Sequence, residues 1–245
     1  MAQKEYIYGK HAVAEAVRNA PHIISKVFIS PSFDDRALVK EIGEKKIPTN
    51  PLKGNGPLGQ DAPHQGLIAL VDTDRLLVPL EKFLETIDID KKPSVAILGE
   101  LHDPHNVGAI IRSAAGFGVS AVLIPHERQA PITGTVVKTS AGMAFRIPLV
   151  SIGNINQTVR LLKEKGFWVY GLSGSGSQSL DKESFDVASA FIIGNEGHGI
   201  RQKTEELCDI TLKIPMHSRT ESFNASVSAS VVFYEWAKHH KEFLA

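Results

Sequence analysis

Short apolar stretches that alternate with helical ones fill the chain from Pro93 onward and limit the folds open to it. Each apolar stretch has the length of a buried strand, and each following segment has helical spacing. The apolar stretches are Val95–Leu98, Ala121–Ile124, Phe167–Leu172, Ala190–Ile193 and Ile210–Ile214. The helical segments are 105–117, 132–140, 154–165, 200–207 and 224–240, with Gly118 and Gly166 placed as C-terminal caps. This order predicts an α/β domain with a mostly parallel sheet and helices on both faces.

The residues before this domain form a smaller α/β unit. It contains helical stretches at 9–17 and 35–45, strands at 26–29 and 67–71, and a Pro/Gly-rich loop at 48–63. Asp34 is the expected cap of the second helix. Residues 76–92 contain one amphipathic helical stretch, Leu80–Ile87, and end in charged residues and Pro93. The predicted organisation is a domain over residues 1–75, a linker over 76–92 and a second domain over 93–245.

Composition excludes several classes of protein. Lys+Arg and Asp+Glu both number 27, so the whole chain has no basic surplus that would attract nucleic acid without specificity. Cys208 is the single cysteine, which excludes an internal disulfide and indicates a small core residue. The 10 histidines show no paired metal-ligand spacing, and no long apolar run suggests a membrane span. We expect a cytoplasmic protein without a metal site.

Two polar motifs follow apolar strands in the larger domain. The first runs from Asp103 to Ala114, where Asp103 and Pro104 account for a helix start but not for Asn106 and Arg112. Asn106 would lie in the crevice beyond the strand, and Arg112 would be available to a phosphate or a carboxylate. The second motif is a turn in which Gly194, Gly197 and Gly199 surround Glu196. A tight turn with a solvated acid is the alternative, but such a turn does not need three glycines.

The C-terminal run carries a third polar motif. Pro215 ends a strand, and Ser222 and Asn224 stand at the start of a helix rich in Ala, Ser and Val. A simple helix cap with a spare serine is the alternative. A further glycine cluster, 171–176, lacks the Lys of a phosphate-binding loop and has the wrong order for a dinucleotide site, which indicates a flexible loop.

Together these motifs resemble those of the SpoU-type RNA 2′-O-ribose methyltransferases of the SPOUT superfamily, in order and spacing, over residues 93–245. Tyr8–Val13 and His64–Gly66 also resemble the small RNA-binding domain of that family, which is similar to a ribosomal protein. The resemblance implies a deep trefoil knot, S-adenosylmethionine as the cofactor, and a homodimer. It further implies methylation of a guanosine ribose in large-subunit rRNA. A tRNA substrate and a non-catalytic RNA-binding or ribosome-assembly protein of the same fold are the alternatives.

The same resemblance assigns roles to individual residues. Arg112, Asn106, Glu196, Ser222 and Asn224 are the expected catalytic residues, with Arg112 either a general base or a group that binds the phosphate and stabilises the alkoxide. Gly194, Ile214, Phe223, Ile193, Gly197 and Met216 are the expected cofactor-binding residues. Lys10, Arg18 and Lys26 are expected to contact RNA phosphates. Gly99-Glu100, Phe223 and Ser218 depart from the usual pattern of Asp-Gly, Leu and Gly at these positions.

Overall fold

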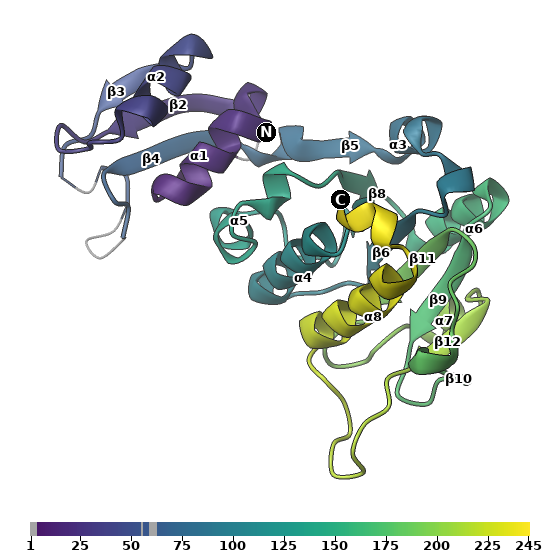
Figure 1. The fold of residues 1–245 in the computed structure, drawn as a ribbon. Coiled ribbons are helices and arrows are strands. Elements are labelled where there is room, and N and C mark those ends of the chain that lie inside the picture. The colour runs from purple at the N-terminus through teal and green to yellow at the C-terminus, as the bar shows by residue number, and fades with distance from the viewer. Residues whose placement is uncertain (1–3, 55, 59–62) are drawn as a thin grey trace.

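The structure is a computed structural model that describes residues 4–54, 56–58 and 63–245, so part of the predicted loop at 48–63, with Gly59, lies outside the described residues. Within these residues the strands form two sheets, one of four strands and one of eight. Figure 1 shows the smaller sheet with its helices at one end of the molecule and the larger sheet at the other. Each helix of the described chain is too short or too polar to cross a membrane.

The smaller sheet has the strand order β1-β4-β2-β3. Its strands are β1 (Lys4–Tyr8), β2 (Ile24–Ile29), β3 (Thr49–Pro51) and β4 (Leu67–Asp72), and its helices are α1 (Lys10–Asn19) and α2 (Arg36–Glu44). β4 pairs antiparallel with both β1 and β2, whereas β3 runs parallel to β2. The sequence predicted neither β1 nor β3. All three residues of β3 are exposed and include a proline, so hydrophobic periodicity could not reveal it.

The cap of α2 differs from the prediction. Asp35, and not Asp34, stands directly before the helix and accepts a hydrogen bond of 3.0 Å from the Leu38 backbone nitrogen. Asp34 is one position too early for its side chain to satisfy the free N–H groups of the first turn. Asp35 also pairs with Lys10 of α1, at 2.9 Å, and thereby joins the two helices of the small unit.

The larger sheet has the strand order β10-β12-β9-β11-β6-β7-β8-β5, and each neighbouring pair is parallel. Its strands are β5 (Leu77–Pro79), β6 (Ser94–Leu98), β7 (Ala121–Pro125), β8 (Leu149–Ile152), β9 (Trp168–Leu172), β10 (Gln178–Ser179), β11 (Ser189–Ile193) and β12 (Ile210–Lys213). Its helices are α3 (Leu80–Thr86), α4 (Pro104–Gly116), α5 (Gly134–Thr139), α6 (Ile155–Lys165), α7 (Gln202–Glu205) and α8 (Ala225–His239). The mostly parallel α/β sheet is therefore confirmed.

Single 3-10 turns connect several of these elements. They are η1 (Pro21–Ile23), η2 (Thr73–Leu76), η3 (Ile89–Lys91), η4 (Met143–Phe145), η5 (Leu180–Lys182) and η6 (Lys241–Leu244). Residues 77–79, placed in the linker by sequence, form edge strand β5 and pair with β8. The domain boundaries at residues 75 and 92 stay predictions, and so does the trefoil knot.

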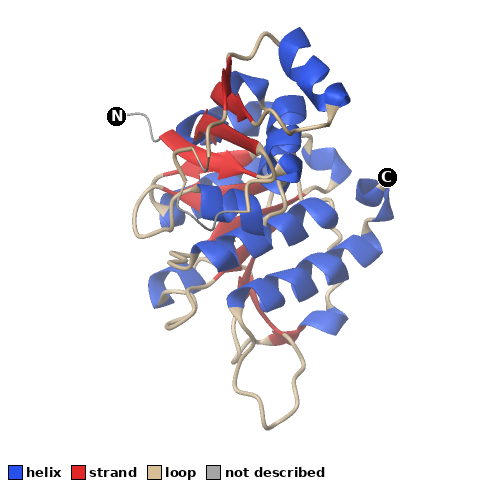
Figure 2. Ribbon diagram, turned by 90° about the vertical axis from the view of Figure 1, so that its left-hand side faces the viewer, coloured by secondary structure: helices blue, strands red, loops and turns tan. Residues whose placement is uncertain are grey.

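Helices cover both faces of the larger sheet, as Figure 2 shows. On one face, side chains such as Leu98 and Ile193 pack with α4, α5 and α8 in one core cluster. On the other face, side chains such as Ile97 and Ile192 pack with α3 and α6 in a second cluster. Successive residues of a strand point to opposite faces, so the continuous apolar strands fill two cores at once.

The small residues of α8 face α4 of the same chain. Ala229 is fully buried, and the Ser230 hydroxyl lies 2.7 Å from the Ser113 hydroxyl on α4. Small side chains let the two helices approach closely, so Ala229 and Ser230 belong to a contact within the chain. Asp103 caps α4 as predicted, at 2.8 Å from the His105 backbone nitrogen. Gly166 ends α6 in the left-handed conformation, as predicted.

Candidate active site

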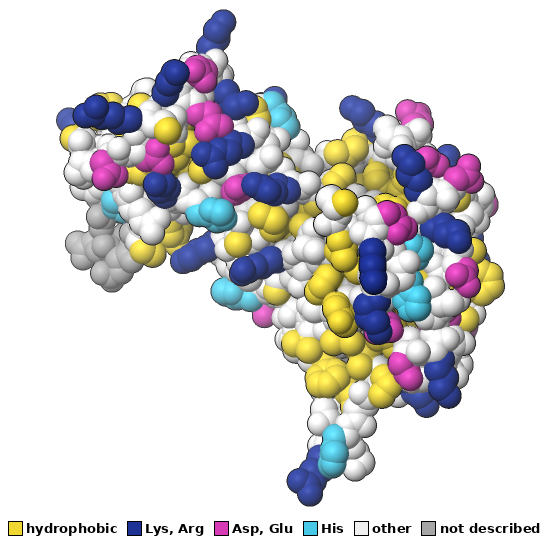
Figure 3. Space-filling view, viewed as in Figure 1, with side chains coloured by type: hydrophobic (Ala, Val, Ile, Leu, Met, Phe, Trp, Pro, Cys, Tyr) yellow, Lys and Arg dark blue, Asp and Glu magenta, His cyan; other side chains and the backbone are white. Residues whose placement is uncertain are grey.

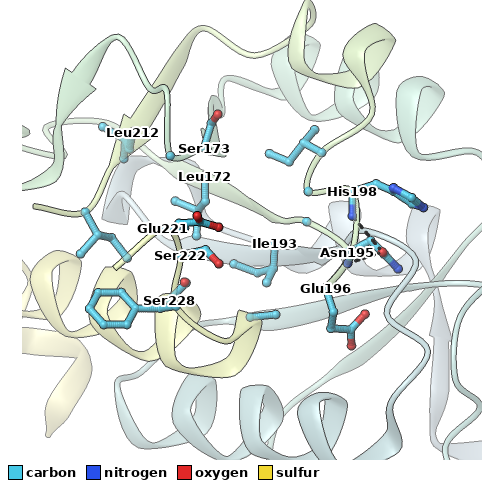
Figure 4. Close-up of a pocket in the computed structure, with 18 of the residues that line it drawn as sticks. Leu172, Ser173, Ile193, Asn195, Glu196, His198, Leu212, Glu221, Ser222 and Ser228 are labelled. Atoms are coloured by element: carbon cyan, nitrogen blue, oxygen red, sulfur yellow. Dashed lines mark hydrogen bonds between the residues drawn. The ribbon is translucent and has the colours of Figure 1, made fainter. Parts of the chain in front are cut away.

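A pocket of about 390 Å³ opens at the carboxyl ends of β9, β11 and β12. Figure 4 shows side chains from segments far apart in sequence, among them Ser173, Ile193 and Ser222, directed into it. Its lining comes from residues 172–174 after β9, 193–200 after β11, the end of β12 and the following loop, and the start of α8. The carboxyl edge of an open parallel sheet is the usual place for a ligand.

The turn after β11 is folded back on itself. The Asn195 and Gly199 backbones exchange two hydrogen bonds of 2.9 Å each. A Cβ on Gly194 would lie 2.5 Å from the Gly199 carbonyl carbon, and Gly199 has a φ of +65°. Gly194 is therefore required because the backbone passes too close for a side chain. Gly199 is favoured because its backbone has a left-handed conformation. A Cβ on Gly197 would meet only the Asn195 Oδ1, at 3.5 Å, so space does not require the middle glycine.

Residues Gly99 and Glu100 brace this turn from β6. A Cβ on Gly99 would lie 2.6 Å from the Ile193 carbonyl oxygen, which explains a glycine there. Glu100 has a φ of +63°, an uncommon conformation for a side chain of its size. Its carbonyl accepts a hydrogen bond of 2.7 Å from Asn195, and its carboxylate pairs with Arg201 at 2.6 Å. The glutamate that departs from the usual Asp-Gly thus forms an ion pair beside this turn.

One hydrogen-bonded chain joins all three polar motifs. Asn106 on α4 donates to Glu196 Oε1, at 3.1 Å, and accepts from Asn224 Nδ2, at 2.9 Å. Asn106 is only 7% exposed, so each of its polar atoms needs such a partner. Asn224 also caps α8 through the Ser226 backbone nitrogen, at 2.8 Å. The simple-cap interpretation of Asn224 is therefore incomplete, because the same side chain also reaches α4.

The structure brings most of the predicted site residues together. All six expected cofactor-binding residues line the pocket: Ile193, Gly194, Gly197, Ile214, Met216 and Phe223. Glu196 and Ser222 line it as well, and Asn106 and Asn224 join it through the hydrogen bonds to Glu196.

Arg112 stands apart from this group. It is exposed on α4 and is not among the described residues that line the pocket. Six positions separate it from Asn106, which is about 240° around an α-helix, so the two side chains leave the helix on different faces. A shared helix was therefore not enough to place Arg112 beside Asn106.

The sequence missed several lining residues. Ser173 and Gly174 belong to the glycine cluster that was predicted to be only a flexible loop, yet both line the pocket. A Cβ on Gly176 would lie 2.6 Å from the Leu212 carbonyl carbon, so the cluster is also packed against β12. Its position directly after β9, at the carboxyl edge of the sheet, was the signal that could have identified it.

The charged lining of the pocket is acidic. Glu196, Glu205 and Glu221 line it together with His198, and no Lys or Arg is found among its described lining residues. Glu205 and Glu221 were not predicted. Cys208, three residues after the end of α7, is half-buried, and burial raises the pKa of its thiol to about 12, so it is protonated at neutral pH. The described residues hold no cluster of His, Cys, Asp and Glu that could bind a metal ion.

Comparison with known proteins assigns the fold and motifs to a family. Residues 93–234 match the model of the SpoU rRNA Methylase family, and residues 6–77 match that of the RNA 2'-O ribose methyltransferase substrate binding domain. The chain belongs to the SpoU family. The match to the first model spans more than half of the chain, and it includes Asn106, Glu196 and Asn224.

Individual relatives agree over nearly the whole chain. The 23S rRNA (guanosine-2'-O-)-methyltransferase RlmB of Neisseria meningitidis is 35% identical, over 96% of this chain and 95% of that protein. RlmB of Xanthomonas campestris is 37% identical, over 95% and 96%. The crystal structure of the SpoU methyltransferase AviRb from Streptomyces viridochromogenes in complex with the cofactor AdoMet superposes with a TM-score of 0.80 at 19% identity, over 98% of this chain and 91% of that chain.

Replacing Asn106 by Asp tests the hydrogen-bonded chain. The substitution keeps the size of the side chain but puts a carboxylate where an amide donates to Glu196, at 3.1 Å. We expect a loss of about 1–3 kcal/mol of unfolding free energy at pH 8, and a smaller loss at pH 5, where the two carboxylates can share a proton. Urea denaturation at both pH values measures the loss. Asn154→Asp, at the exposed cap of α6, is the control and should change little, and an equal loss for Asn106→Asp at both pH values would contradict the contact.

Proposed function

We propose that the chain transfers a methyl group from S-adenosylmethionine to the 2′-oxygen of a guanosine ribose in large-subunit rRNA. The observation that carries this proposal is the meeting of the three polar motifs at one pocket through Asn106. Membership of the SpoU family and the activity named for the RlmB relatives support the reaction and the rRNA substrate. The AdoMet complex of AviRb supports the cofactor.

The pocket suits this cofactor. Leu172, Ile193, Leu212 and Ile214 offer apolar surface for an adenine ring, and the close folding of the turn at Gly194 exposes backbone groups beside them. The three lining carboxylates complement the positive charges of the sulfonium and the ammonium. When bound, the cofactor supplies an electrophilic methyl group.

Residues of this chain would align the ribose and help to remove the proton of its 2′-hydroxyl. Glu196 and Ser222 line the pocket and can accept hydrogen bonds from ribose hydroxyls, while Asn106 and Asn224 hold Glu196 in place. A guanidinium stays protonated, so Arg112 is better suited to bind a phosphate and stabilise the developing alkoxide than to act as a base.

An exposed apolar face on α8 is the candidate surface for a homodimer. Val227 and Tyr234 are 45% and 55% exposed on α8, and Tyr234 packs against Phe117, the residue that follows the end of α4. In Figure 3 hydrophobic side chains gather over this region of the larger domain. We infer that a second copy of the chain covers this face and that Arg112 contacts RNA at its border.

The first experiment supplies the purified protein with S-adenosylmethionine carrying a labelled methyl group, and with large-subunit rRNA or tRNA. Label at a guanosine ribose of the large-subunit rRNA is expected. Arg112→Ala should lower the rate about a thousandfold, or about 4 kcal/mol of transition-state stabilisation, while cofactor affinity stays unchanged. Label in tRNA alone would overturn the rRNA substrate, and absence of both label and cofactor binding would overturn the proposed enzymatic activity.

A pair of alanine substitutions tests the cofactor site. Gly194→Ala forces the turn open, because the new Cβ would lie 2.5 Å from the Gly199 carbonyl carbon. Its affinity for S-adenosylmethionine should fall at least about tenfold, a change of about 1.4 kcal/mol. Gly197→Ala adds the same methyl group to the same turn without such a clash, and its affinity should stay near that of the wild type. Isothermal titration calorimetry measures both, and equal affinities for the two variants would place the cofactor elsewhere.

The oligomeric state tests the dimer face. The wild-type protein should sediment as a dimer at micromolar concentration, and Val227→Asp should sediment as a monomer because a charge would be buried at the interface. Val39→Asp, at a 39% exposed position on α2, is the matched control and should remain a dimer. Ala229 is unsuitable for this test, because it is fully buried within the chain and a charged residue there would disturb folding. A monomeric wild type would exclude the dimer.

A further inference from the structure

The small unit contacts the larger domain directly, in addition to the covalent link between them. Its helix α1 packs against η4, and its strand β1 packs against α5. The Lys138 ammonium on α5 lies 5.2 Å from the ring centre of Tyr8 and 3.4 Å from its hydroxyl oxygen. The covalent link is also short, because β4 ends at Asp72 and β5 begins at Leu77. The two parts therefore meet through a defined contact surface (Figure 1).

An ion pair between Glu15, which is buried, and Arg146, whose side chain is 51% exposed, lies on this surface. Glu15 of α1 is 3% exposed, and its carboxylate accepts hydrogen bonds from Arg146 Nε, at 2.5 Å, and from Arg146 Nη2, at 2.9 Å. Asn19 of the same helix donates a third hydrogen bond, at 3.0 Å. The Arg146 guanidinium lowers the pKa of the Glu15 carboxyl below its ordinary value, so both partners are charged at neutral pH. A two-pronged contact of this kind fixes orientation as well as distance.

The backbone opposite Glu15 is shaped to receive it. Gly142 has a φ of +80°, and a Cβ there would lie 2.9 Å from Glu15 Cβ and Cγ. Ala141 has a φ of +52°, and its carbonyl oxygen lies 3.1 Å from His11 Nε2 on α1. Such conformations persist where the surrounding contacts maintain them. The turn after α5 therefore forms the surface against which α1 packs.

This turn is connected to the active site through α4. The turn and α5 pack against α4, where a Cβ on Gly108 would lie 2.7 Å from Thr139 Cβ. Gly108 is two positions beyond Asn106, which binds Glu196 at the pocket. A tilt of the small unit against this turn would change the position of the small unit relative to the pocket.

We propose that Glu15 and Arg146 are positioning residues, which lock the RNA-binding unit in one orientation so that bound RNA is presented to the pocket. The inference rests on the proposed function for its RNA substrate. Of the three cations first expected to contact phosphate, Lys10 and Arg18 already pair with Asp35 and Glu41 inside the small unit, at 2.9 and 3.1 Å. Arg146 makes an ion pair between the two parts, and Lys138 contacts Tyr8 across the same surface. The pair acts on the placement of the RNA and leaves the cofactor pocket untouched.

The test compares Glu15→Gln, Arg146→Gln and the double variant with the wild type. Glu15→Gln keeps the size of the side chain and removes its charge. Glu44→Gln is the matched control, because it breaks the exposed Lys40–Glu44 pair within the small unit, at 3.6 Å. Small-angle X-ray scattering reports the arrangement of the two parts without any assay of activity. Steady-state methylation gives KM for large-subunit rRNA and kcat, and calorimetry gives the Kd of S-adenosylmethionine.

Both single variants should scatter as a broader range of shapes and raise the KM for RNA about tenfold, with kcat and the cofactor Kd unchanged. The double variant should match the single ones, because partners that act through each other are not additive. Glu44→Gln should behave as the wild type. Unchanged scattering and KM in both single variants overturn the proposal, and so does a matching loss of cofactor affinity, which would indicate a role in folding alone. Scattering needs no substrate. A change in shape without methylation of any RNA would therefore refute the proposed function but would still support the inference that Glu15 and Arg146 fix the orientation of the small unit.

Discussion

The hydrogen bonds of the Asn106 side chain hold the candidate site together. Its amide joins Glu196 on one side and Asn224 on the other, and so ties the segments after β6, β11 and β12 to each other. A buried amide left without partners would cost about 1–3 kcal/mol. The three segments are therefore held together as one unit beside the pocket. The order of the motifs along the chain matters less than their meeting at this one side chain.

Strands buried on both faces were among those that could be predicted, although the partly buried β12 was also predicted and β8 was not. Val95–Leu98 and Ala190–Ile193 lie at the middle of the larger sheet, where every side chain is buried and the apolar run is continuous. β5 and β10 lie at its two edges and have three and two residues, too few for a periodic pattern. They become strands because a neighbour offers them hydrogen bonds. Edge strands of this kind depend on tertiary structure and not on their own sequence.

The site residues also divide into those that local sequence could identify and those that depend on tertiary structure. Backbone requirements at Gly194 and Gly199 are local, so the turn could be recognised from its glycines. The outward direction of Arg112 depends on which face of α4 is buried by α5 and α8, which no local pattern states. Glu221 was missed for a related reason, since it lies in the long loop between β12 and α8, where no periodicity marks a side chain as facing the pocket (Figure 4). The choice of Asp35 over Asp34 as the cap of α2 was within one residue, which is the ordinary uncertainty of a helix boundary.

The acidic lining of the pocket bears on turnover as well as on binding. S-adenosylmethionine carries a positive charge on sulfur, and this charge is gone once the methyl group has left. Glu196, Glu205 and Glu221 therefore attract the fresh donor more strongly than the spent thioether. The same carboxylates that favour entry of the cofactor weaken retention of its product. With the proposed cofactor bound here, the charges of the pocket favour replacement of the product by a new donor molecule.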